Sequence, residues 1–164
     1  MFINNGSIDD TLNLLNSEIA LTKNNRINYY NVVKNFGYGH GILEGINQVD
    51  SEHICWTHAD LQFRAKDVTS IIDEYLNSHN NTEVYKGQRN SRFFFDTIFT
   101  KLMSVIGLLL KGIYISDINA QPKIFSRVIF SKITDWPIDF SLDAHLLYEI
   151  KKKKYSIIKK ERTQ

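Results

Sequence analysis

The hydrophobic positions along the chain follow two spacings, one typical of strands and one typical of amphipathic helices. Short β-branched and aromatic runs predict strands, at residues 2–3, 28–33, 54–57, 83–86, 117–125, 138–142 and 155–158. Apolar residues three or four positions apart predict helices, at residues 12–19, 42–49, 66–76, 93–115 and 143–152. Because strands and helices alternate at short intervals, we expect an α/β fold whose mostly parallel, Rossmann-like sheet is flanked by helices.

Two loops of unusual composition follow predicted strands. One is the Gly-rich segment 35–41, and the other is the segment 58–62, which follows the strand 54–57. That strand is apolar enough to be buried on both faces. Ligands of α/β sheets bind at the carboxyl ends of the strands, so we expect both loops to border the site. The acidic residues of 9–11 are predicted to cap the first helix and to place negative charge in its first turn.

The most apolar part of the chain is the predicted helix 93–115. Asp96, Lys101 and Lys111 interrupt it, and its longest charge-free run, 102–110, is far shorter than the roughly 20 residues of a membrane-spanning helix. We therefore interpret this segment as a core helix in preference to a helix lying in the membrane interface.

Composition and length narrow the class of protein. Of the 164 residues, 43% are hydrophobic and 23% are charged, which excludes a disordered or collagen-like chain and predicts one domain. The single Cys55 cannot form an internal disulfide, and its place in an apolar strand indicates a core residue. No secretory pattern is visible in the first ten residues, so a cytoplasmic protein is expected.

The charge of the chain is unevenly distributed. The net charge is +2, but residues 150–164 hold seven of the 20 basic residues and only one of the 18 acidic residues. Such a segment can meet an anionic membrane surface, nucleic acid or only solvent. Nucleic acid is disfavoured, because the basic run has no interleaved aromatic residues and the rest of the chain is net acidic.

The strongest candidate chemistry lies in the segment His58-Ala59-Asp60-Leu61-Gln62. A carboxylate at the end of a buried strand can bind a divalent cation that also holds a diphosphate. The alternative for Asp60 is a turn or a helix cap. The Gly-rich loop lacks the Lys-Ser/Thr ending of a P-loop, so it permits a close approach to a ligand or is simply a flexible turn.

Further charged residues follow later strands. Arg89 and Arg92 come just after a predicted strand, where guanidinium groups suit phosphate oxygens. Lys123 lies near the end of the segment 117–125. Asp117 and Asp143 are candidate general bases, and each is equally a candidate helix cap.

Six segments resemble, in the correct order, motifs of the family 2 glycosyltransferases with a GT-A fold. The resemblance is strongest to the branch of the dolichyl-phosphate and other polyprenyl-phosphate sugar transferases. The family's "DDGS-x-D-x-T", "N-x-G-x-G", "D-x-D-x-Q", Gly-Ser-Arg, "D-x-x-x-G-F-[RK]" and acid-headed helix are similar to residues 4–11, 35–39, 58–62, 87–89, 117–123 and 140–148.

The resemblance implies an inverting transferase that binds a nucleotide-diphosphate sugar. The acceptor would be a polyprenyl phosphate at the cytosolic face of the membrane or a growing surface glycan of the cell envelope. The residues implied to contact the nucleotide are Asn4, Asn5, Gly6, Asn35, Gly37 and Asp60. Those implied to hold Mn²⁺ or Mg²⁺ are His58, Asp60 and Gln62.

On the acceptor side, the resemblance assigns Arg89, Arg92 and Lys123 to a phosphate group. It assigns the role of base to Asp143 or Asp117, with Asp60 at the reacting diphosphate. A phosphate acceptor is already anionic at neutral pH, so it would need little base catalysis, and electrostatic positioning would dominate.

The chain departs from the family pattern at several points. His58 replaces the first acid of the metal motif, and imidazole suits Mn²⁺ better than Mg²⁺. Asparagines replace the two acids before Gly6. The family's first strand and its far end have no counterpart, which predicts a partial domain over residues 1–164, truncated at the N-terminus. The alternative is a catalytically inactive GT-A remnant that acts as a binding module.

Overall fold

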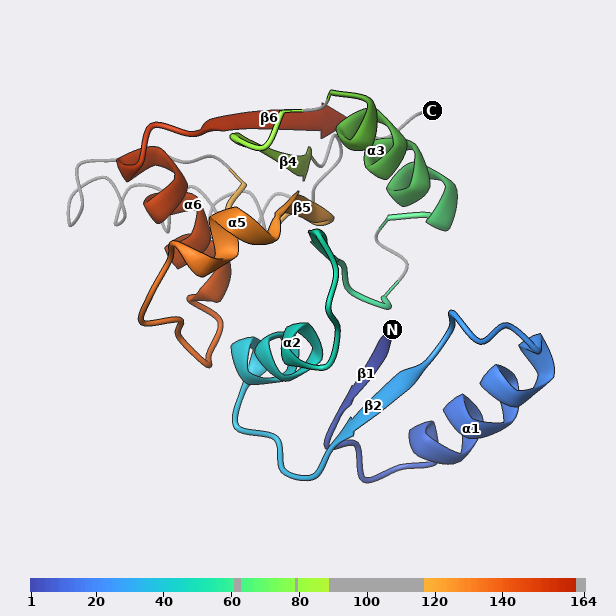
Figure 1. Ribbon diagram of the computed structural model, residues 1–164. Coiled ribbons are helices and arrows are strands. Elements are labelled where there is room, and N and C mark those ends of the chain that lie inside the picture. Colours follow the sequence, from blue (N-terminus) through green and yellow to red (C-terminus); the bar gives the residue numbers. More distant parts are fainter. Residues whose placement is uncertain (61–62, 79, 89–116, 162–164) are drawn as a thin grey trace, which may run out of the picture. The chain divides into compact units, whose positions relative to one another are not determined.

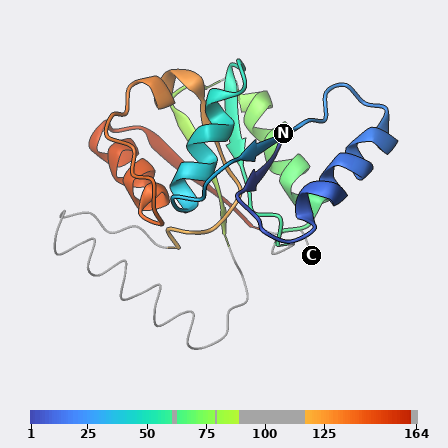
Figure 2. The same cartoon turned by 90° about the horizontal axis from the view of Figure 1, so that it is seen from below.

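The computed structural model describes residues 1–60, 63–78, 80–88 and 117–161 (Figure 1). The chain divides into two compact units. The first unit comprises Met1–Asp50 and Asp135–Leu142, and the second comprises Ser51–Thr134 and Asp143–Gln164. Figure 2 shows the same elements in a view turned by 90°. The prediction of a single domain over 1–164 stays a prediction.

The first unit contains a parallel pair of strands and two helices. Strand β1 (Phe2–Asn5) pairs with β2 (Tyr29–Val32), with Phe2 opposite Tyr29 and Asn5 opposite Val32. The helices are α1 (Thr11–Thr22) and α2 (Tyr38–Asn47). These elements confirm the strands predicted at 2–3 and 28–33 and the helix predicted through 12–19.

The start of helix α1 differs in detail from the prediction. The side chain of Asp9 accepts hydrogen bonds from the backbone N and the Oγ1 of Thr11, at 3.1 and 2.6 Å. Asp10 occupies the N-cap position without a side-chain cap bond, and the first turn carries no acid. Asp9 therefore binds Thr11 from the position before the N-cap, whereas the predicted side-chain cap and the predicted negative charge in the first turn are both wrong.

Helix α2 begins inside the segment that the sequence predicts to be a Gly-rich loop. Gly37 stands at its N-cap with φ of 136°, and Gly39 and Gly41 are buried in its first turns. A Cβ at Gly39 would lie 2.4 Å from the carbonyl oxygen of Pro137, and one at Gly41 would lie 2.7 Å from the side chain of Asn5. The glycines are therefore sites of close packing rather than of a flexible turn.

The second unit is built on a four-stranded sheet with the order β3-β5-β4-β6. The strands are β3 (His53–Trp56), β4 (Glu83–Gln88), β5 (Lys123–Ser126) and β6 (Ser156–Glu161). Strand β5 runs antiparallel to both of its neighbours, and β4 and β6 are parallel. The predicted α/β architecture with flanking helices is confirmed, but this sheet is mixed rather than mostly parallel.

Three helices of the second unit are described, α3 (Ala65–Ser78), α5 (Arg127–Ser131) and α6 (Leu142–Lys152). The first and last confirm the predicted helices. The sequence analysis missed α5, a helix of five residues whose N-cap Ser126 accepts a bond from the backbone N of Ile129.

Two predicted strands are wrong in whole or in part. Residues 138–142 form a bend and the start of α6, because the carboxylate of Asp139 accepts bonds from the backbone N and the Oγ of Ser141. The predicted strand 117–125 begins only at Lys123. Before it, Asp117 adopts a left-handed φ of 53° and its carbonyl accepts a bond from Ala120 N at 3.1 Å, which closes a turn.

The core of the second unit lies between the sheet and its helices. Ile71 and Tyr75 of α3 pack with Tyr85 of β4 and Ile124 of β5. The surface of Cys55 in strand β3 is exposed, whereas burial raises the pKa of its thiol to about 12, so its interpretation as a core residue stays a prediction.

The predicted helix 93–115 lies outside the described residues. Within the described parts of the chain, no helix combines the length and the apolar character needed to cross a membrane.

Candidate functional site

A cluster of asparagines lies at the carboxyl ends of β1 and β2. Asn4 is 3% exposed, and its Nδ2 donates to Oδ1 of Asn31 at 2.8 Å. The Oδ1 of Asn4 accepts a bond from the backbone N of Ser7 at 3.2 Å, which ties the following turn to the strand. Asn4 thereby links the end of β1 to β2 through neutral amides.

Asn5 links the same strand end to the start of α2. Its Nδ2 donates to the carbonyl oxygen of Gly37 at 3.0 Å and to Oδ1 of Asn35 at 3.3 Å. That Oδ1 also accepts a bond from Gly37 N at 2.8 Å. The Oδ1 of Asn5 is buried and has no hydrogen-bond partner among the described residues. This oxygen is therefore a hydrogen-bond acceptor beside the start of α2 that receives no bond there.

Gly6 fits the close approach of these two loops. Its φ is 70°, and a Cβ there would lie 2.9 Å from the backbone N of Asn35. The structure thus brings together all the nucleotide-contacting residues expected in the first unit, which are Asn4, Asn5, Gly6, Asn35 and Gly37.

His58 and Asp60 follow the end of β3 in the second unit. The Nδ1 of His58 lies 3.6 Å from Oδ2 of Asp60, and the two side chains are 37% and 41% exposed. These donors fit a divalent cation of the kind that takes one or two protein side chains and completes its coordination with substrate phosphates and water. In the described ranges, no three His, Cys, Asp or Glu side chains gather into a metal-binding group. Gln62, the third expected ligand, lies outside them.

The residues expected to serve as phosphate ligand and as base meet each other. Lys123 Nζ lies 2.8 Å from Oδ1 of Asp143, and both side chains are buried. Lys123 also donates to the carbonyl oxygen of Ala120 at 3.1 Å. The side chains of Lys123 and Asp143 are therefore buried, whereas those of His58 and Asp60 are exposed to solvent.

Two further side chains of the described residues contact Asp143. Trp56 Nε1 donates to its Oδ1 at 3.2 Å, and Gln121 Nε2 donates to its Oδ2 at 3.0 Å. The carboxylate therefore connects the end of β3, the turn before β5 and the start of β5.

Comparison with known proteins decides the family. Residues 1–134 match the model of Glycosyl transferase family 2. The chain belongs to glycosyl transferase family 2. This assignment confirms the expected family and its α/β, GT-A-like fold, and the expectation of a glycosyltransferase domain.

The family 2 domain is also similar to a protein of Bacillus subtilis (strain 168) named "Putative glycosyltransferase CsbB". The two are 30% identical over 92 residues, which make up 56% of this chain. The match spans 27% of that relative's own length, so it concerns only part of the larger protein.

The remaining acidic candidate of the family 2 domain is Asp117. It is 8% exposed and lies in the turn that leads to β5. Lys86 of β4 is 1% exposed and stands opposite Lys123 in the register of β4 and β5. Arg89 and Arg92, the expected phosphate ligands, lie outside the described residues.

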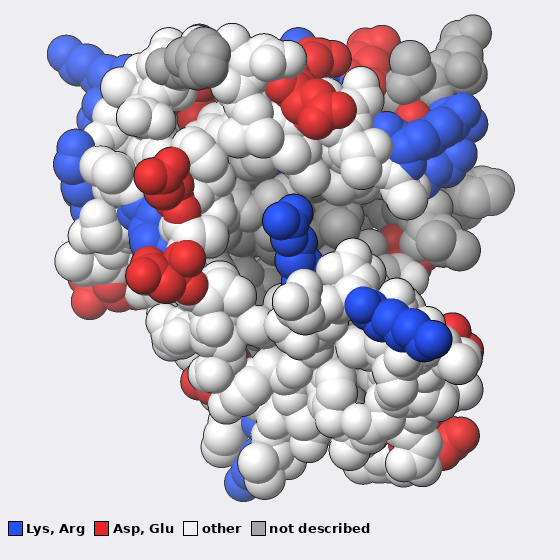
Figure 3. All heavy atoms as spheres, turned by 45° about the vertical axis from the view of Figure 1, so that its right-hand side comes forward, with Lys and Arg blue, Asp and Glu red and all other residues white. Residues whose placement is uncertain are grey.

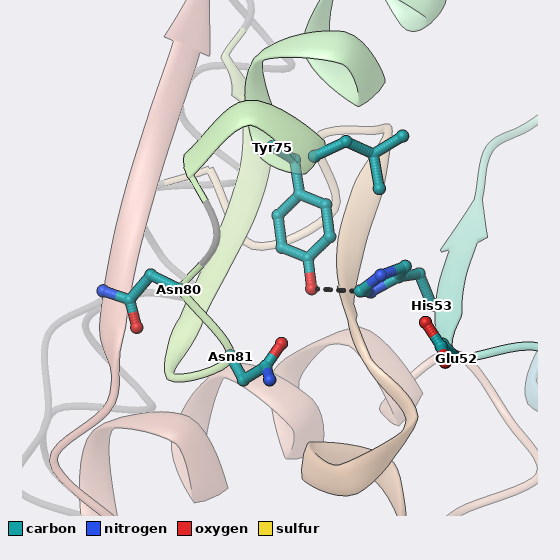
Figure 4. A pocket seen from close by; sticks show the side chains of 6 residues that line it. Glu52, His53, Tyr75, Asn80 and Asn81 are labelled. Carbon is teal, nitrogen blue, oxygen red and sulfur yellow. Dashed lines mark hydrogen bonds between the residues drawn. The ribbon is translucent and has the colours of Figure 1, made fainter.

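A hollow of about 190 Å³ opens at the beginning of strand β3 (Figure 4). His58 and Asp60 follow the other end of this strand. The hollow is lined by Glu52, His53, Tyr75, Leu76, Asn80 and Asn81. His53 Nδ1 and Tyr75 Oη lie 3.2 Å apart. Burial, followed by the charges of Glu83 and Tyr85, raises the pKa of Tyr75 to about 12. The sequence analysis gave this place no role.

Sequence reasoning missed three residues that shape the site. Trp56 and Gln121 hold Asp143, and Gly87 permits the turn before β5 to pack on β4, because a Cβ there would lie 1.9 Å from the carbonyl oxygen of Gln121. An isolated glycine inside a strand signals such a close approach. The predicted strand 83–86 stops before Gly87, however, and only the structure extends β4 to Gln88. Trp56, two residues before the candidate metal ligand His58, gave a weaker signal.

Proposed function

We propose that this family 2 domain binds a nucleotide-diphosphate sugar and serves the transfer of its sugar to an acceptor. The observation that carries the proposal is the exposed pair of His58 and Asp60, 3.6 Å apart, directly after a strand end. Membership of the family and the similarity to a named glycosyltransferase support it.

In this proposal His58, Asp60 and Gln62 hold a divalent cation together with the diphosphate of the donor. The cation offsets the charge that develops on the departing diphosphate. Because imidazole is a better ligand for Mn²⁺ than for Mg²⁺, the replacement of an acid by His58 favours Mn²⁺.

The asparagine cluster of the first unit is proposed to contact the nucleoside. The buried Oδ1 of Asn5 supplies an acceptor that an N–H or O–H group can satisfy. Asn4 and Asn35 hold the neighbouring backbone in place through the bonds described above. Amides in place of carboxylates retain hydrogen bonding and add no negative charge beside an anionic donor.

The proposed acceptor is a polyprenyl phosphate or a growing surface glycan, with inversion at the transferred carbon. A phosphate acceptor is anionic at neutral pH and needs no base to become a nucleophile. Its binding by Arg89, Arg92 and Lys123 stays a prediction. Of these, Lys123 would have to exchange its bond to Asp143 for one to the acceptor.

The direct test is calorimetric binding of UDP- and GDP-sugars with Mn²⁺ or Mg²⁺. We expect the wild type to bind one donor in a metal-dependent manner, and Asp60→Ala to weaken binding at least tenfold, because a carboxylate ligand is lost. Asp73→Ala, which removes an exposed aspartate on α3, is the matched control and should bind as the wild type does. Equal binding by Asp60→Ala and the wild type would contradict the proposal.

A second candidate function is a catalytically inactive binding module. The mutual burial of Lys123 and Asp143 favours it, because a candidate base and a candidate phosphate ligand occupy each other. Transfer of labelled sugar by the purified chain to a polyprenyl phosphate would exclude this candidate. Donor binding without transfer would support it.

A further inference from the structure

Asp143 is placed poorly for a base and well for an anchor. It lies in the first turn of α6 and is 1% exposed. Its Oδ1 meets Lys123 at 2.8 Å and Trp56 at 3.2 Å, and its Oδ2 meets Gln121 at 3.0 Å. A general base must reach the proton that it takes. The buried carboxylate of Asp143 instead faces three donors of its own chain.

Two segments that are distant from Asp143 in sequence converge on its carboxylate. Trp56 is the last residue of β3, Gln121 lies in the turn before β5, and Lys123 is the first residue of β5. A carboxylate in the first turn is also favoured by the dipole of its own helix. From the first turn of α6, Asp143 therefore contacts the end of β3 and the start of β5.

We propose that Asp143 is a positioning residue, which fixes the end of β3 through the indole of Trp56 and thereby orients His58 and Asp60. This inference rests on the proposed function, because it assigns a role at the same cation site.

The short distance along the chain makes the anchor effective. His58 comes two residues after Trp56, a reach of roughly 7 Å even when the chain is fully extended. The indole is itself held, since it is 8% exposed and packs edge-to-face on Phe125 with ring centroids 5.3 Å apart. Ligand side chains must be held to within about 0.5 Å for a productive site. A loosened indole would therefore displace the nearby ligands.

The variants separate anchoring from charge. Trp56→Phe removes the indole N–H but keeps an aromatic ring against Phe125. Asp143→Asn with Lys123→Met removes both buried charges together and leaves an amide oxygen that can still accept from Trp56. Asp143→Ala with Lys123→Met removes the acceptor as well. Trp136→Phe, at the chain's other tryptophan, is the matched control.

The measurement is the affinity of each folded variant for Mn²⁺ with UDP or GDP, taken well below its unfolding temperature. Loss of a residue that supports a metal ligand typically weakens metal affinity by about 10- to 100-fold. We therefore expect about tenfold weaker binding in Trp56→Phe and in the alanine variant, which is Asp143→Ala combined with Lys123→Met. The asparagine variant, which is Asp143→Asn combined with Lys123→Met, and the control Trp136→Phe should bind within about twofold of the wild type.

Combining Trp56→Phe with the alanine variant should weaken binding no further, because both changes break the same bond. Wild-type affinity in Trp56→Phe, or additive losses in the combination, would overturn the inference. A residue with only a structural role would lower the unfolding temperature and leave the affinity unchanged, which also overturns it. If the wild type itself binds no nucleotide with Mn²⁺, the proposed function fails, and the inference falls with it.

Discussion

Lys123 and Asp143 form an ion pair in the interior of the second unit, with 2.8 Å between Nζ and Oδ1 and both side chains buried. Attraction between buried charges is largely offset by the loss of their hydration. Such a pair therefore adds little net stability, but each partner becomes costly once the other is removed.

The first prediction concerns this pair. Lys123→Met should destabilise the fold by about 3–5 kcal/mol, because Asp143 is left as an uncompensated buried charge. Adding Asp143→Asn should recover most of the loss, as measured by urea denaturation. The control is Lys152→Met, whose ammonium lies 3.6 Å from Glu149 at the surface and should change stability by no more than about 1 kcal/mol. Additive losses from the two buried changes would contradict the account.

The packing of Gly87 gives a second prediction. A Cβ at this position would lie 1.9 Å from a backbone carbonyl oxygen, so Gly87→Ala should destabilise the fold by about 2–3 kcal/mol through overpacking. Gly45→Ala is the comparison, because its Cβ would meet only the end of the Ile3 side chain and a helix gains from alanine. Thermal unfolding of both variants checks this. A smaller loss in Gly87→Ala than in Gly45→Ala would show that the close approach is absent.

The raised pKa of Tyr75 leads us to predict that the free energy of unfolding falls at alkaline pH. Its pKa is raised to about 12, so folding favours the neutral phenol, and this contribution is complete below the unfolded pKa of about 10 and is lost as pH rises toward 12. At pH 11 the loss amounts to about 1 kcal/mol.

Tyr75→Phe serves as the probe of this effect. At pH 8 it should be less stable than the wild type, because the contact with His53 is lost. Since phenylalanine does not ionise, the difference in the free energy of unfolding should shrink by about 1 kcal/mol at pH 11. A difference that stays constant between pH 8 and pH 11 would refute the assignment.

A membrane-directed role of the basic segment yields a fourth prediction. Lys151, Lys152, Lys153 and Lys154 are exposed at the end of α6, where Glu149 lies near two of them. On the face drawn in Figure 3, basic and acidic side chains are interspersed. Each lysine near an anionic bilayer contributes about 1 kcal/mol.

Cosedimentation with anionic vesicles measures that contribution. Replacing residues 151–154 with glutamine should abolish binding to the vesicles, whereas the same change at Lys23 and Lys66 should reduce it much less. If the glutamine replacement at 151–154 did not change vesicle binding, these lysines would have no role at the membrane and would only face solvent.

Periodicity made much of the fold readable from the sequence. The helices α1, α3 and α6 and the strands β1 to β4 lie where apolar spacing placed them. Close packing could not be read in the same way. The start of α2 depends on Gly39 meeting the carbonyl of Pro137, and the late start of β5 depends on a turn closed at Asp117, contacts that only the folded chain creates.

The candidate site divides along the same line. The pair His58 and Asp60 was readable because the two residues are neighbours in sequence after one strand end. The asparagines Asn4, Asn5 and Asn35 were named only through the family resemblance, and 30 positions separate Asn5 from Asn35. The pairing of Lys123 with Asp143 was not readable, since 20 positions separate them and one lies on strand β5 whereas the other lies on helix α6. The antiparallel course of β5 between β3 and β4 was likewise hidden, because local patterns do not encode strand direction.

The central claim is that His58 and Asp60 hold a divalent cation for a nucleotide-diphosphate sugar. Its most direct test is the affinity of the wild-type chain for UDP- and GDP-sugars, with Mn²⁺ present and after chelation by EDTA. The account predicts binding of one donor that is lost on chelation and restored by added Mn²⁺. Absence of binding to either donor, or an affinity that EDTA does not change, would contradict it.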